Sequence, residues 1–505
     1  MNKQISRLAL VGIVLISALI LMTSLIVATT YWQTWAAGGL ADRQDNAIQQ
    51  VAQYTIKRGL IYASDGRTVL AANKPTKTAD HILYFRRYPK GSLTAHVVGY
   101  STRFRNRAGL ERSENDYLTG ANGNLGAVFS TEIDRLKGQT VKGNSLVLTI
   151  DANLQALANR ALAGKCGSIV ATDPTTGRVL VMASSPTYNP NAAEKPDFLQ
   201  IVGRIKAGCD FVAPLLNRAT SGLFTPGSTF KIVTVSAALD TGKFTPDSNF
   251  QDPGYCMEYN KKVYNSGNPD QNGPEQFGSL SLFTGFQHSV NSVFCNVGKS
   301  LGAATVLDYA KRFGYYSVPP LETPINERAP SGLYHGPHLF RPKDPATQVD
   351  PGRLAFGQEH LLTTPLQSVM VTSAIADGGA VMKPFVVARV LDPHGKTIRK
   401  TKPDELGRAV KRSTADEVTK MMIAAVEGGT GTAARISGIQ VAGKTGTAET
   451  GVNHVNTTWF TSFAPADAPK IAITVVLEQQ HGFGGTTAAP IARQIMQAYL
   501  SRGSK

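Results

Sequence analysis

The stretch Pro226-Gly-Ser-Thr-Phe-Lys231 decides which fold and which chemistry we expect of this chain. Its proline and glycine favour a tight turn, and the apolar pattern behind them predicts a helix from Thr229 to Ala238. Ser228 and Lys231 are three residues apart, so one helical turn places both side chains on the same face. A serine hydroxyl is a poor nucleophile until a base removes its proton, and a lysine amine is such a base only when it is neutral. The spacing therefore predicts a nucleophile and its base, with a helix cap and a surface lysine as the alternative.

The second informative motif is Lys444-Thr-Gly446. Apolar residues precede it, and its glycine lets another backbone approach closely, which favours an edge strand that binds an extended peptide. The amine of Lys444 and the hydroxyls of Thr445 and Thr447 are suited to holding a carboxylate. A nucleotide-binding P-loop is the alternative, because residues 438–445 formally match its consensus. A P-loop follows a strand and opens a helix, whereas here the residues between the glycines look like the strand itself.

The third motif, Ser-x-Asn, occurs at residues 113–115, 266–268 and 289–291. The copy at 289–291 lies between two helical patterns, where a hydroxyl can shuttle a proton and an amide can hold a substrate carbonyl. The copy at 266–268 lies in a loop rich in glycine, proline and asparagine. We therefore expect Ser289 and Asn291 to be the functional pair.

The order S-x-x-K, S-x-N and K-T-G resembles that of the penicillin-binding proteins and class A β-lactamases. Other stretches resemble landmarks of the same transpeptidase domain: Leu148–Asp151, Asp173–Gly177, Met182–Pro186, Gly357-Gln358 and Trp459-Phe460. The region before Asp151 resembles the pedestal of class B penicillin-binding proteins at Arg58-Gly59, Arg86–Gly91 and Gly109–Glu111. The short pedestal is most like that of the penicillin-binding protein A type of actinobacteria.

This resemblance implies a serine-type peptidoglycan D,D-transpeptidase that cross-links D-Ala-D-Ala stem peptides through an acyl-serine intermediate and is inhibited by β-lactams. It implies no cofactor and no metal. The catalytic residues that it implies are Ser228, Lys231, Ser289, Asn291 and Lys444, and the substrate and oxyanion residues are Thr445, Gly446 and Thr447. Enzymatic alternatives on the same fold are a D,D-carboxypeptidase and a β-lactamase-like hydrolase. Non-enzymatic alternatives are a division scaffold and a β-lactam sensor.

The order of apolar patterns predicts an α/β fold of the α+β type, and the resemblance implies the penicillin-binding/serine β-lactamase-like transpeptidase fold. We expect an antiparallel sheet flanked by helices, an all-helical subdomain and a smaller mixed N-terminal pedestal. Strand patterns lie at 59–71, 95–100, 145–150, 167–172, 178–183, 441–447, 457–463 and 471–477. Helical patterns lie at 151–162, across 197–315, at 364–377 and 413–427, and from 489 onward.

The stretch Leu8–Ala28 carries no charge and is long enough to cross a hydrocarbon layer of ~30 Å. Lys3 and Arg7 precede it, so the positive-inside rule predicts that everything after it is extracytoplasmic. We expect a cytoplasmic tail at 1–7, a single membrane anchor at 8–28, the pedestal at 29–150 and the transpeptidase domain at 151–505. A cleaved signal peptide is the alternative to an anchor. The family resemblance also implies a glycan polymerase of the SEDS class as a membrane partner.

Composition bounds the remaining possibilities. Of the 505 residues, 42% are hydrophobic and 17% are charged, which is typical of a folded chain. Lysine and arginine exceed aspartate and glutamate by 16, but the excess is dispersed, so we expect no nucleic-acid partner. The chain has four cysteines and no C-x-x-C. One or two disulfides, in any of three full pairings, or four free thiols are compatible with this pattern.

Overall fold

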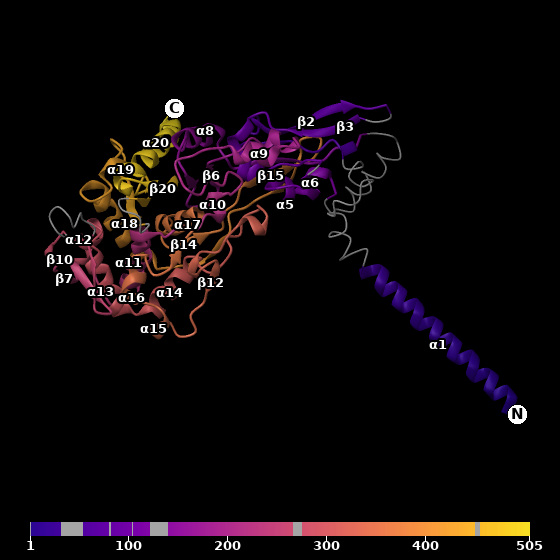
Figure 1. The fold of residues 1–505 in the computed structure, drawn as a ribbon, viewed down its shortest axis with the longest axis horizontal. Helices are drawn as coiled ribbons and strands as arrows, with labels where there is room; N and C mark the ends of the chain where they lie inside the picture. The colour runs from indigo at the N-terminus through magenta and orange to yellow at the C-terminus, as the bar shows by residue number, and fades with distance from the viewer. Residues whose placement is uncertain are drawn as a thin grey trace.

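A five-stranded antiparallel sheet, in the order β18-β19-β20-β5-β6, runs through the computed structural model (Figure 1). The model describes residues 2–31, 54–79, 82–103, 105–121, 140–265, 275–449 and 455–504. The strands are β5 (Gly167–Thr172), β6 (Val179–Ser185), β18 (Ala442–Glu449), β19 (Asn456–Ala464) and β20 (Ile471–Gln480). Because helices cover both faces, the central strands are continuous runs of buried residues. The strands expected from the sequence in this domain are all confirmed.

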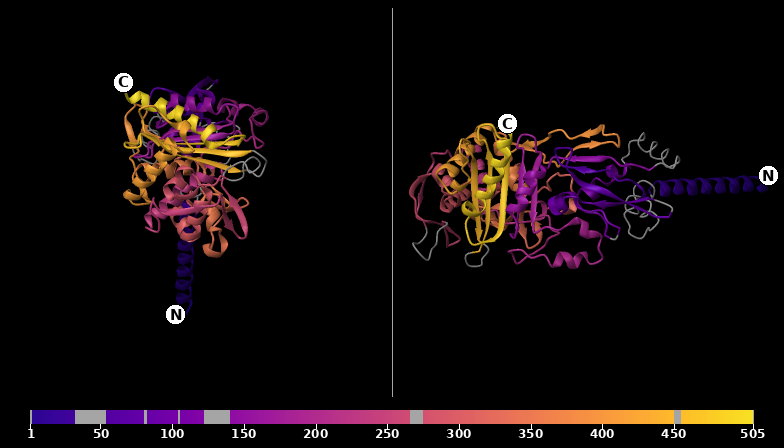
Figure 2. Two further views of the ribbon diagram at one scale, coloured as in Figure 1. Left: turned by 90° about the vertical axis from the view of Figure 1, so that its left-hand side faces the viewer. Right: turned by 90° about the horizontal axis from the view of Figure 1, so that it is seen from above.

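Two helices, α8 (Ala152–Ala161) and α20 (Ala489–Leu500), cover one face of this sheet (Figure 2). The other face packs on α17 (Pro365–Ala376), of which all but the last residue is buried. A fourth helix, α18 (Arg412–Glu427), lies against β18. The predicted helix cap is confirmed, since the Asp151 carboxylate accepts hydrogen bonds from the first backbone N–H groups of α8.

Short helices build the lobe beside β18. They are α10 (Arg218–Ser221), η4 (Gly227–Phe230), α11 (Lys231–Asp240), α12 (Leu282–Gln287), α13 (Asn291–Leu301), α14 (Ala303–Arg312), α15 (Pro345–Gln348) and α16 (Pro351–Ala355). The prediction of helix across 197–315 was wrong at 249–264 and at 278–281. These segments contain the strand pairs β7 (Asn249–Asp252) with β10 (Gly278–Ser281), and β8 (Tyr255–Glu258) with β9 (Lys261–Tyr264). These strands are too short for their alternation to stand out between helices. Residues 266–268 lie outside the described part of the chain.

The pedestal contributes to a second, six-stranded sheet in the order β16-β15-β4-β1-β2-β3. Its strands are β1 (Ile61–Tyr62), β2 (Val69–Lys77), β3 (Ile82–Arg87), β4 (Ser145–Leu148), β15 (Val387–Leu391) and β16 (Thr397–Lys400). Since β15 and β16 follow the pedestal by more than 200 residues in the chain, this sheet joins the two regions. The predicted strand at 95–100 was wrong, because Ala95–Val98 forms the buried helix α4, in which packing outweighs the strand preference of valine.

A buried ion cluster holds the pedestal together. The carboxylate of Glu111 accepts from Nε of Arg58 at 2.8 Å and from Nε of Arg86 at 2.7 Å. The side chain of Glu111 is fully buried. Burial opposes ionisation of this carboxyl, but the two guanidinium groups outweigh it and lower its pKa.

The remaining elements are short and connect these layers. They are η2 (Gly91–Thr94), α5 (Leu110–Ser113), α6 (Asn115–Thr119), η3 (Pro190–Glu194), α9 (Phe198–Gly203), η5 (Ile325–Glu327), β11 (Gly332–His335), β12 (His338–Phe340), β13 (Leu361–Leu362), β14 (Ala380–Met382), β17 (Glu405–Arg408), η6 (Thr432–Ala434), α19 (Gly484–Thr487) and η7 (Ser501–Ser504).

The N-terminal helix α1 (Asn2–Thr30) contains the stretch Gly12–Thr30, which is long and apolar enough to cross a membrane. It is the one such helix among the described residues, and none of this stretch is buried against the rest of the structure. The helix therefore agrees, by length and composition, with the predicted anchor. The boundaries of the four predicted segments stay predictions.

All four cysteines are paired, as Cys166–Cys209 and Cys256–Cys295. The sequence had left the pairing open. Glu258 lies beside the second disulfide, and these three residues are the one group with metal-ligand types in close contact in the described ranges. Because both of its sulfurs are bonded to each other, this group lacks the thiolates that would bind a metal.

Candidate active site

The turn that carries Ser228 is clamped between β18 and a second loop. Gly227 has φ 52°, and a Cβ on it would lie 2.9 Å from the carbonyl oxygen of Thr447. Its backbone N–H donates to the carbonyl of Gly357 at 3.2 Å, and a Cβ on Gly357 would lie 2.3 Å from the carbonyl oxygen of Gly227. Glycine is therefore required at both positions, and these close backbone contacts fix the position of the turn. The predicted helix starts as the 3-10 turn η4 before α11 begins at Lys231.

Ser228 is partly exposed in this turn. Its hydroxyl has no hydrogen-bond partner within the described ranges, so it is open to a substrate. Lys231, one turn further on, is fully buried. Its Nζ donates to the backbone carbonyl of Ser289 at 2.6 Å and to Oδ1 of Asn291 at 2.7 Å. A neutral amine has two N–H groups, so the two shorter of its three contacts can use both and leave its lone pair for a hydroxyl proton.

Lys444 is the second buried amine of the site, with no exposed surface. Its Nζ donates to Oγ of Ser289 at 2.7 Å and to the carbonyl of Thr445 at 3.1 Å. The same hydroxyl lies 3.3 Å from Nζ of Lys231, so Ser289 joins the two lysines. The structure thus brings together the residues predicted from three separate motifs.

Both amines are shifted toward their neutral forms. Burial lowers the pKa of Lys444 to about 7. Burial, and after it the charge of Lys444, lowers the pKa of Lys231 well below its ordinary value. Two aromatic rings lie beside these amines: Phe294 is 5.2 Å from the Lys231 amine and Phe286 is 5.6 Å from the Lys444 amine, each measured to the ring centroid. Neither ring could be predicted from the sequence, because any apolar residue fits the helical patterns in which Phe286 and Phe294 lie.

Ser289 is held in an unusual backbone conformation, with φ 62°. This left-handed region costs a non-glycine residue about 1–2 kcal/mol. In this conformation its carbonyl meets one lysine and its hydroxyl meets both. Strained backbone of this kind is typical of functional sites.

The predicted edge strand is confirmed, since β18 ends the five-stranded sheet. A Cβ on Gly446 would lie 2.8 Å from Cγ2 of Thr229 and 3.0 Å from the carbonyl oxygen of Pro226, so this glycine lets η4 lie against the strand. The Thr445 hydroxyl is hydrogen-bonded to that of Thr430 at 2.6 Å, a contact that the sequence did not reveal. The P-loop alternative is excluded, as expected from the sequence, because the motif forms a strand and opens no helix.

The Thr447 hydroxyl, further along β18, accepts from the backbone N–H of Gly484 at 3.3 Å. Trp459, opposite Gly446 on β19, is fully buried and its Nε1 donates to the carbonyl of Thr225 at 3.0 Å. This bond ties the segment before η4 to the sheet. The other Ser-x-Asn copy in the described ranges, 113–115, lies in the pedestal, where Asn115 accepts from Arg58.

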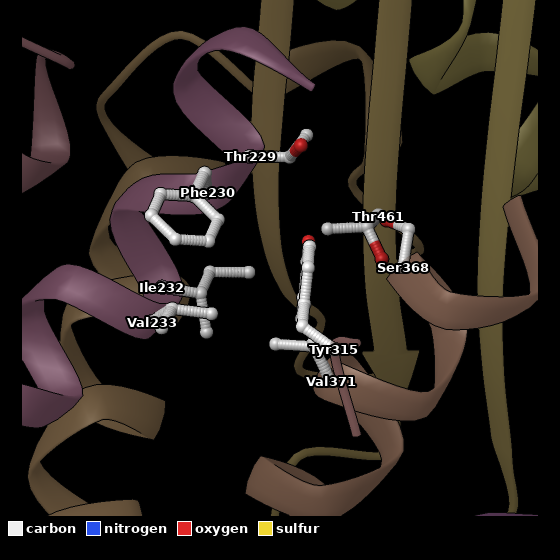
Figure 3. A pocket seen from close by; sticks show the side chains of 8 residues that line it. All are labelled: Thr229, Phe230, Ile232, Val233, Tyr315, Ser368, Val371 and Thr461. Carbon is white, nitrogen blue, oxygen red and sulfur yellow. The ribbon is translucent and has the colours of Figure 1, made fainter. Parts of the chain in front are cut away.

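A small cavity lies behind η4 and α11 (Figure 3). It is lined by Thr229, Phe230, Ile232, Val233, Tyr315, Ser368, Val371 and Thr461. None of the predicted catalytic residues lines it. The figure shows it where α11 packs on α17 and β19, so it belongs to the packing of the core and not to the site.

A partly exposed serine thus lies one turn from a buried amine and beside the edge of β18, an arrangement that is suited to acyl transfer. Residues 167–497 match the family model described as "Penicillin binding protein transpeptidase domain", and residues 58–146 match "Penicillin binding protein A dimerisation domain". The chain therefore belongs to the penicillin-binding protein family.

Its relatives include the "Peptidoglycan D,D-transpeptidase PbpA" of Mycolicibacterium smegmatis, 32% identical over 521 residues and 100% of both chains. The protein of the same name from Mycobacterium tuberculosis is 32% identical over 99% of both chains. Among solved structures, the ceftriaxone acyl-enzyme complex of M. tuberculosis penicillin-binding protein A has a TM-score of 0.78 at 29% identity, covering 89% of this chain and 100% of that one. A D,D-transpeptidase domain from Eggerthella lenta has a TM-score of 0.74 at 32% identity, covering 89% and 99%. These matches confirm the predicted family and fold class.

Proposed function

We propose that this chain is a peptidoglycan D,D-transpeptidase that is acylated by β-lactams, with Ser228 as its nucleophile. One observation carries the assignment of residues: Ser289 Oγ lies within 2.7 Å of Lys444 Nζ and 3.3 Å of Lys231 Nζ, and both amines are buried. Buried amines with a lowered pKa are suited to accepting a proton from a hydroxyl at neutral pH. The relatives named above carry the activity in their names, and related structures are β-lactam acyl-enzymes.

In the acylation step, Ser228 Oγ attacks the carbonyl carbon of the penultimate D-Ala and its proton passes to Nζ of Lys231. Backbone N–H groups of Ser228 and Thr447 stabilise the oxyanion. The tetrahedral intermediate collapses, the C–N bond to the terminal D-Ala breaks, and the leaving amine receives a proton through the Ser289 hydroxyl. Lys444 donates a hydrogen bond to the Ser289 hydroxyl and so holds it in place. This hydroxyl then receives the proton from Lys231, whose amine is neutral again.

In the second step, an amine of a neighbouring stem peptide attacks the ester. Its proton passes to Lys231 and then to Ser228 Oγ as the C–O bond breaks, which restores the enzyme. The amide of Asn291 orients the substrate, and the edge of β18 at Thr445, Gly446 and Thr447 receives the peptide backbone and its carboxylate. A β-lactam follows the same first step, but its acyl-enzyme resists the second.

The pedestal favours transpeptidation over the hydrolytic alternatives. Matches to the transpeptidases cover the whole chain, including the region before Asp151. A D,D-carboxypeptidase would release D-Ala from a stem peptide without forming a dimer, and a β-lactamase would turn over penicillin. Mass spectrometry of the products therefore separates the three activities.

We place the catalytic domain outside the cytoplasmic membrane, tethered by α1. Lys3 and Arg7 precede the apolar stretch, and the two disulfides persist in an oxidising compartment. A SEDS-class glycan polymerase is the membrane partner that we propose. Co-purification from detergent that is lost when α1 is exchanged for an unrelated apolar helix supports this partner, and an unchanged yield contradicts it.

The central test is Ser228→Ala, assayed by covalent labelling with a fluorescent penicillin. We expect a folded protein, judged by its melting temperature, with no labelling, because the hydroxyl that forms the ester is missing. Peptide mapping of the parent protein should locate the adduct on Ser228. Labelling that persists in the variant would exclude Ser228 as the nucleophile.

A further inference from the structure

The β8–β9 hairpin lies beside the site with little of its own to hold it in place. Among the described residues its two strands pair only with each other, and they are joined by Tyr259 and Asn260, which have φ 44° and 63°. A two-stranded hairpin alone is marginally stable in water. The buried side chains of the hairpin are Cys256 and Glu258. A carboxyl group therefore occupies a buried position at which an apolar side chain would pack more favourably. Contacts with another element must therefore hold it.

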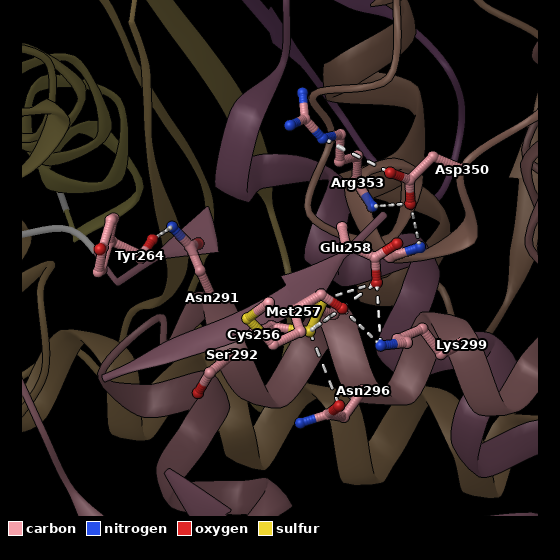
Figure 4. Close-up of a disulfide and its surroundings, with 12 residues drawn as sticks. Cys256, Met257, Glu258, Tyr264, Asn291, Ser292, Asn296, Lys299, Asp350 and Arg353 are labelled. Carbon is pink, nitrogen blue, oxygen red and sulfur yellow. Dashed lines mark hydrogen bonds and ion pairs between the residues drawn. A yellow bond between two sulfur atoms is a disulfide. The ribbon is translucent and has the colours of Figure 1, made fainter. Parts of the chain in front are cut away.

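Most of those contacts come from helix α13 and centre on a disulfide (Figure 4), while Glu258 also lies against Asp350 and Gly352 at the start of α16. Cys256 of β8 is bonded to Cys295 of α13, with 6.3 Å between their Cα atoms. One turn further along, the Nζ of Lys299 donates to the carbonyl of Met257 at 2.6 Å and lies 3.4 Å from Glu258 Oε1. The disulfide is the covalent tie, and Lys299 is a weaker second one because its side chain is 43% exposed.

The same helix carries a site residue. Asn291 opens α13 and lies four residues before Cys295, so both are on one face. Its Nδ2 donates to the carbonyl of Tyr264, in β9, at 3.2 Å, while its Oδ1 accepts from Lys231 at 2.7 Å. An amide has one donor end and one acceptor end. The hairpin carbonyl therefore determines that the acceptor end faces the amine.

This orientation has a chemical consequence. If the hairpin moves away, the amide is free to rotate and to present its N–H groups to Lys231. A neutral amine would then accept that hydrogen bond with the lone pair that must receive the Ser228 proton. The base would be occupied, although every catalytic residue would still be present.

We propose that the Cys256–Cys295 disulfide is a positioning element of the acylation site, which holds the hairpin on α13 so that the Tyr264 carbonyl keeps the Asn291 amide turned toward Lys231. The inference rests on the roles proposed above for Lys231 and Asn291. The second disulfide provides a matched comparison. Cys166–Cys209 closes a loop with a sequence separation of 43, against 39 for Cys256–Cys295, and its cysteines make no hydrogen bond with the site residues in the described ranges.

The test compares Cys256→Ser/Cys295→Ser with Cys166→Ser/Cys209→Ser, both in the full chain. Because the two loops are nearly equal in length, loss of either disulfide should release similar unfolded-chain entropy and lower the melting temperature by similar amounts. We expect the second-order rate constant for acylation by penicillin to fall about 10-fold to 100-fold in the first variant. The second variant should stay within about twofold of the parent.

A double-mutant cycle separates positioning from general loosening. In an Asn291→Ala background, removing Cys256–Cys295 should cause no further loss of acylation rate, because the amide that it positions is gone. Lys299→Met, which removes the weaker tie from a half-exposed position, should lower the rate in the same direction even if the double serine variant fails to fold. Equal losses in the two disulfide variants, or additive losses in the cycle, would overturn the positioning role. Acylation of the parent chain tests the proposed function separately.

Discussion

The Nζ of Lys444 donates to Oγ of Ser289 at 2.7 Å, and the same hydroxyl lies 3.3 Å from Nζ of Lys231. Two amines that share one hydroxyl in a buried site cannot both be charged without a large cost, because no carboxylate of the described residues pairs with either of them. At least one is therefore neutral at physiological pH. The hydroxyl is a ready path for the proton that moves between them and the leaving group.

The first prediction concerns the pH dependence of acylation. The reaction needs the neutral form of Lys231, so the rate should fall as pH drops through the lowered pKa of this amine. Lys444→Met removes the neighbouring charge that helps to lower it, so the acid limb should move to higher pH. Stopped-flow acylation by a chromogenic β-lactam measures both profiles. Lys231→Met should slow acylation by ~10²–10⁴-fold at every pH. If the rate falls at the same acidic pH in the parent and in Lys444→Met, the charge of Lys444 does not affect the pKa of Lys231.

The second prediction is that Lys444→Met stabilises the protein while it impairs activity. The unfolded chain holds this proton up to its ordinary pKa of 10.5, whereas the folded protein releases it near 7. Between these values the unfolded state binds more protons, so the stability of the parent rises with pH. Below pH 7 the folded protein bears the full cost of burying the charged Lys444 amine. We expect the variant to gain about 2–4 kcal/mol at pH 7 and progressively less toward pH 10. Urea unfolding at several pH values tests this, and a pH-independent difference would argue against a buried, shifted amine.

The third prediction separates the backbone of residue 289 from its hydroxyl. Ser289→Gly and Ser289→Ala both remove the group that joins the lysines, so both should lose acylation to a similar degree. Glycine relieves the cost of φ 62°, whereas alanine keeps it. The glycine variant should therefore be more stable than the alanine variant by about 1 kcal/mol in chemical denaturation. Equal stabilities would mean that the φ of this residue relaxes when the hydroxyl is lost.

The residues of the candidate site were easier to pick out from the sequence than the fold around them, for a physical reason. Ser228 and Lys231 are one helical turn apart, and Gly446 lies in a single strand that another backbone approaches closely. Local spacing in the sequence is therefore enough to predict both features. The partnership of Ser289 with both lysines was expected through the order of motifs, since no local rule brings residues so far apart in the chain together. The burial of both amines was not visible, because side chains from several elements enclose them.

The missed features are long-range in the chain. The disulfide partners are about 40 residues apart, and spacing does not choose among the three pairings. The pairing of β15 with β4 joins residues that are more than 200 apart in the chain, so the local sequence of neither strand predicts it. The helix at Ala95–Val98 was mistaken for a strand because four buried residues are too few to show a period of 3.6. In each case tertiary packing supplied information that local pattern lacks.

The fourth prediction concerns the pedestal, where Glu111 is buried between Arg58 and Arg86. Glu111→Gln keeps the shape but leaves two buried guanidinium groups without a counter-charge, which should cost about 3–5 kcal/mol of unfolding free energy. The pKa of Glu111 is lowered in the folded state, so its contribution is complete above the ordinary value of 4.5 and declines as pH falls below it. The difference between parent and variant should shrink over that acidic range.

A matched control for this change is Glu417→Gln, which breaks a solvent-exposed pair with Lys420 and should leave the denaturation midpoint almost unchanged, because water screens exposed ion pairs. Because no atom of the Glu111 cluster contacts the acylation site in the described ranges, the fraction of Glu111→Gln that remains folded should react with penicillin at the parent rate. Denaturant titration and active-site labelling of the same samples measure both quantities. A slower reaction per folded molecule would mean that the pedestal sets the geometry of the site as well as its stability. The β4–β15 pairing, which joins the pedestal to the transpeptidase domain, could transmit such an effect.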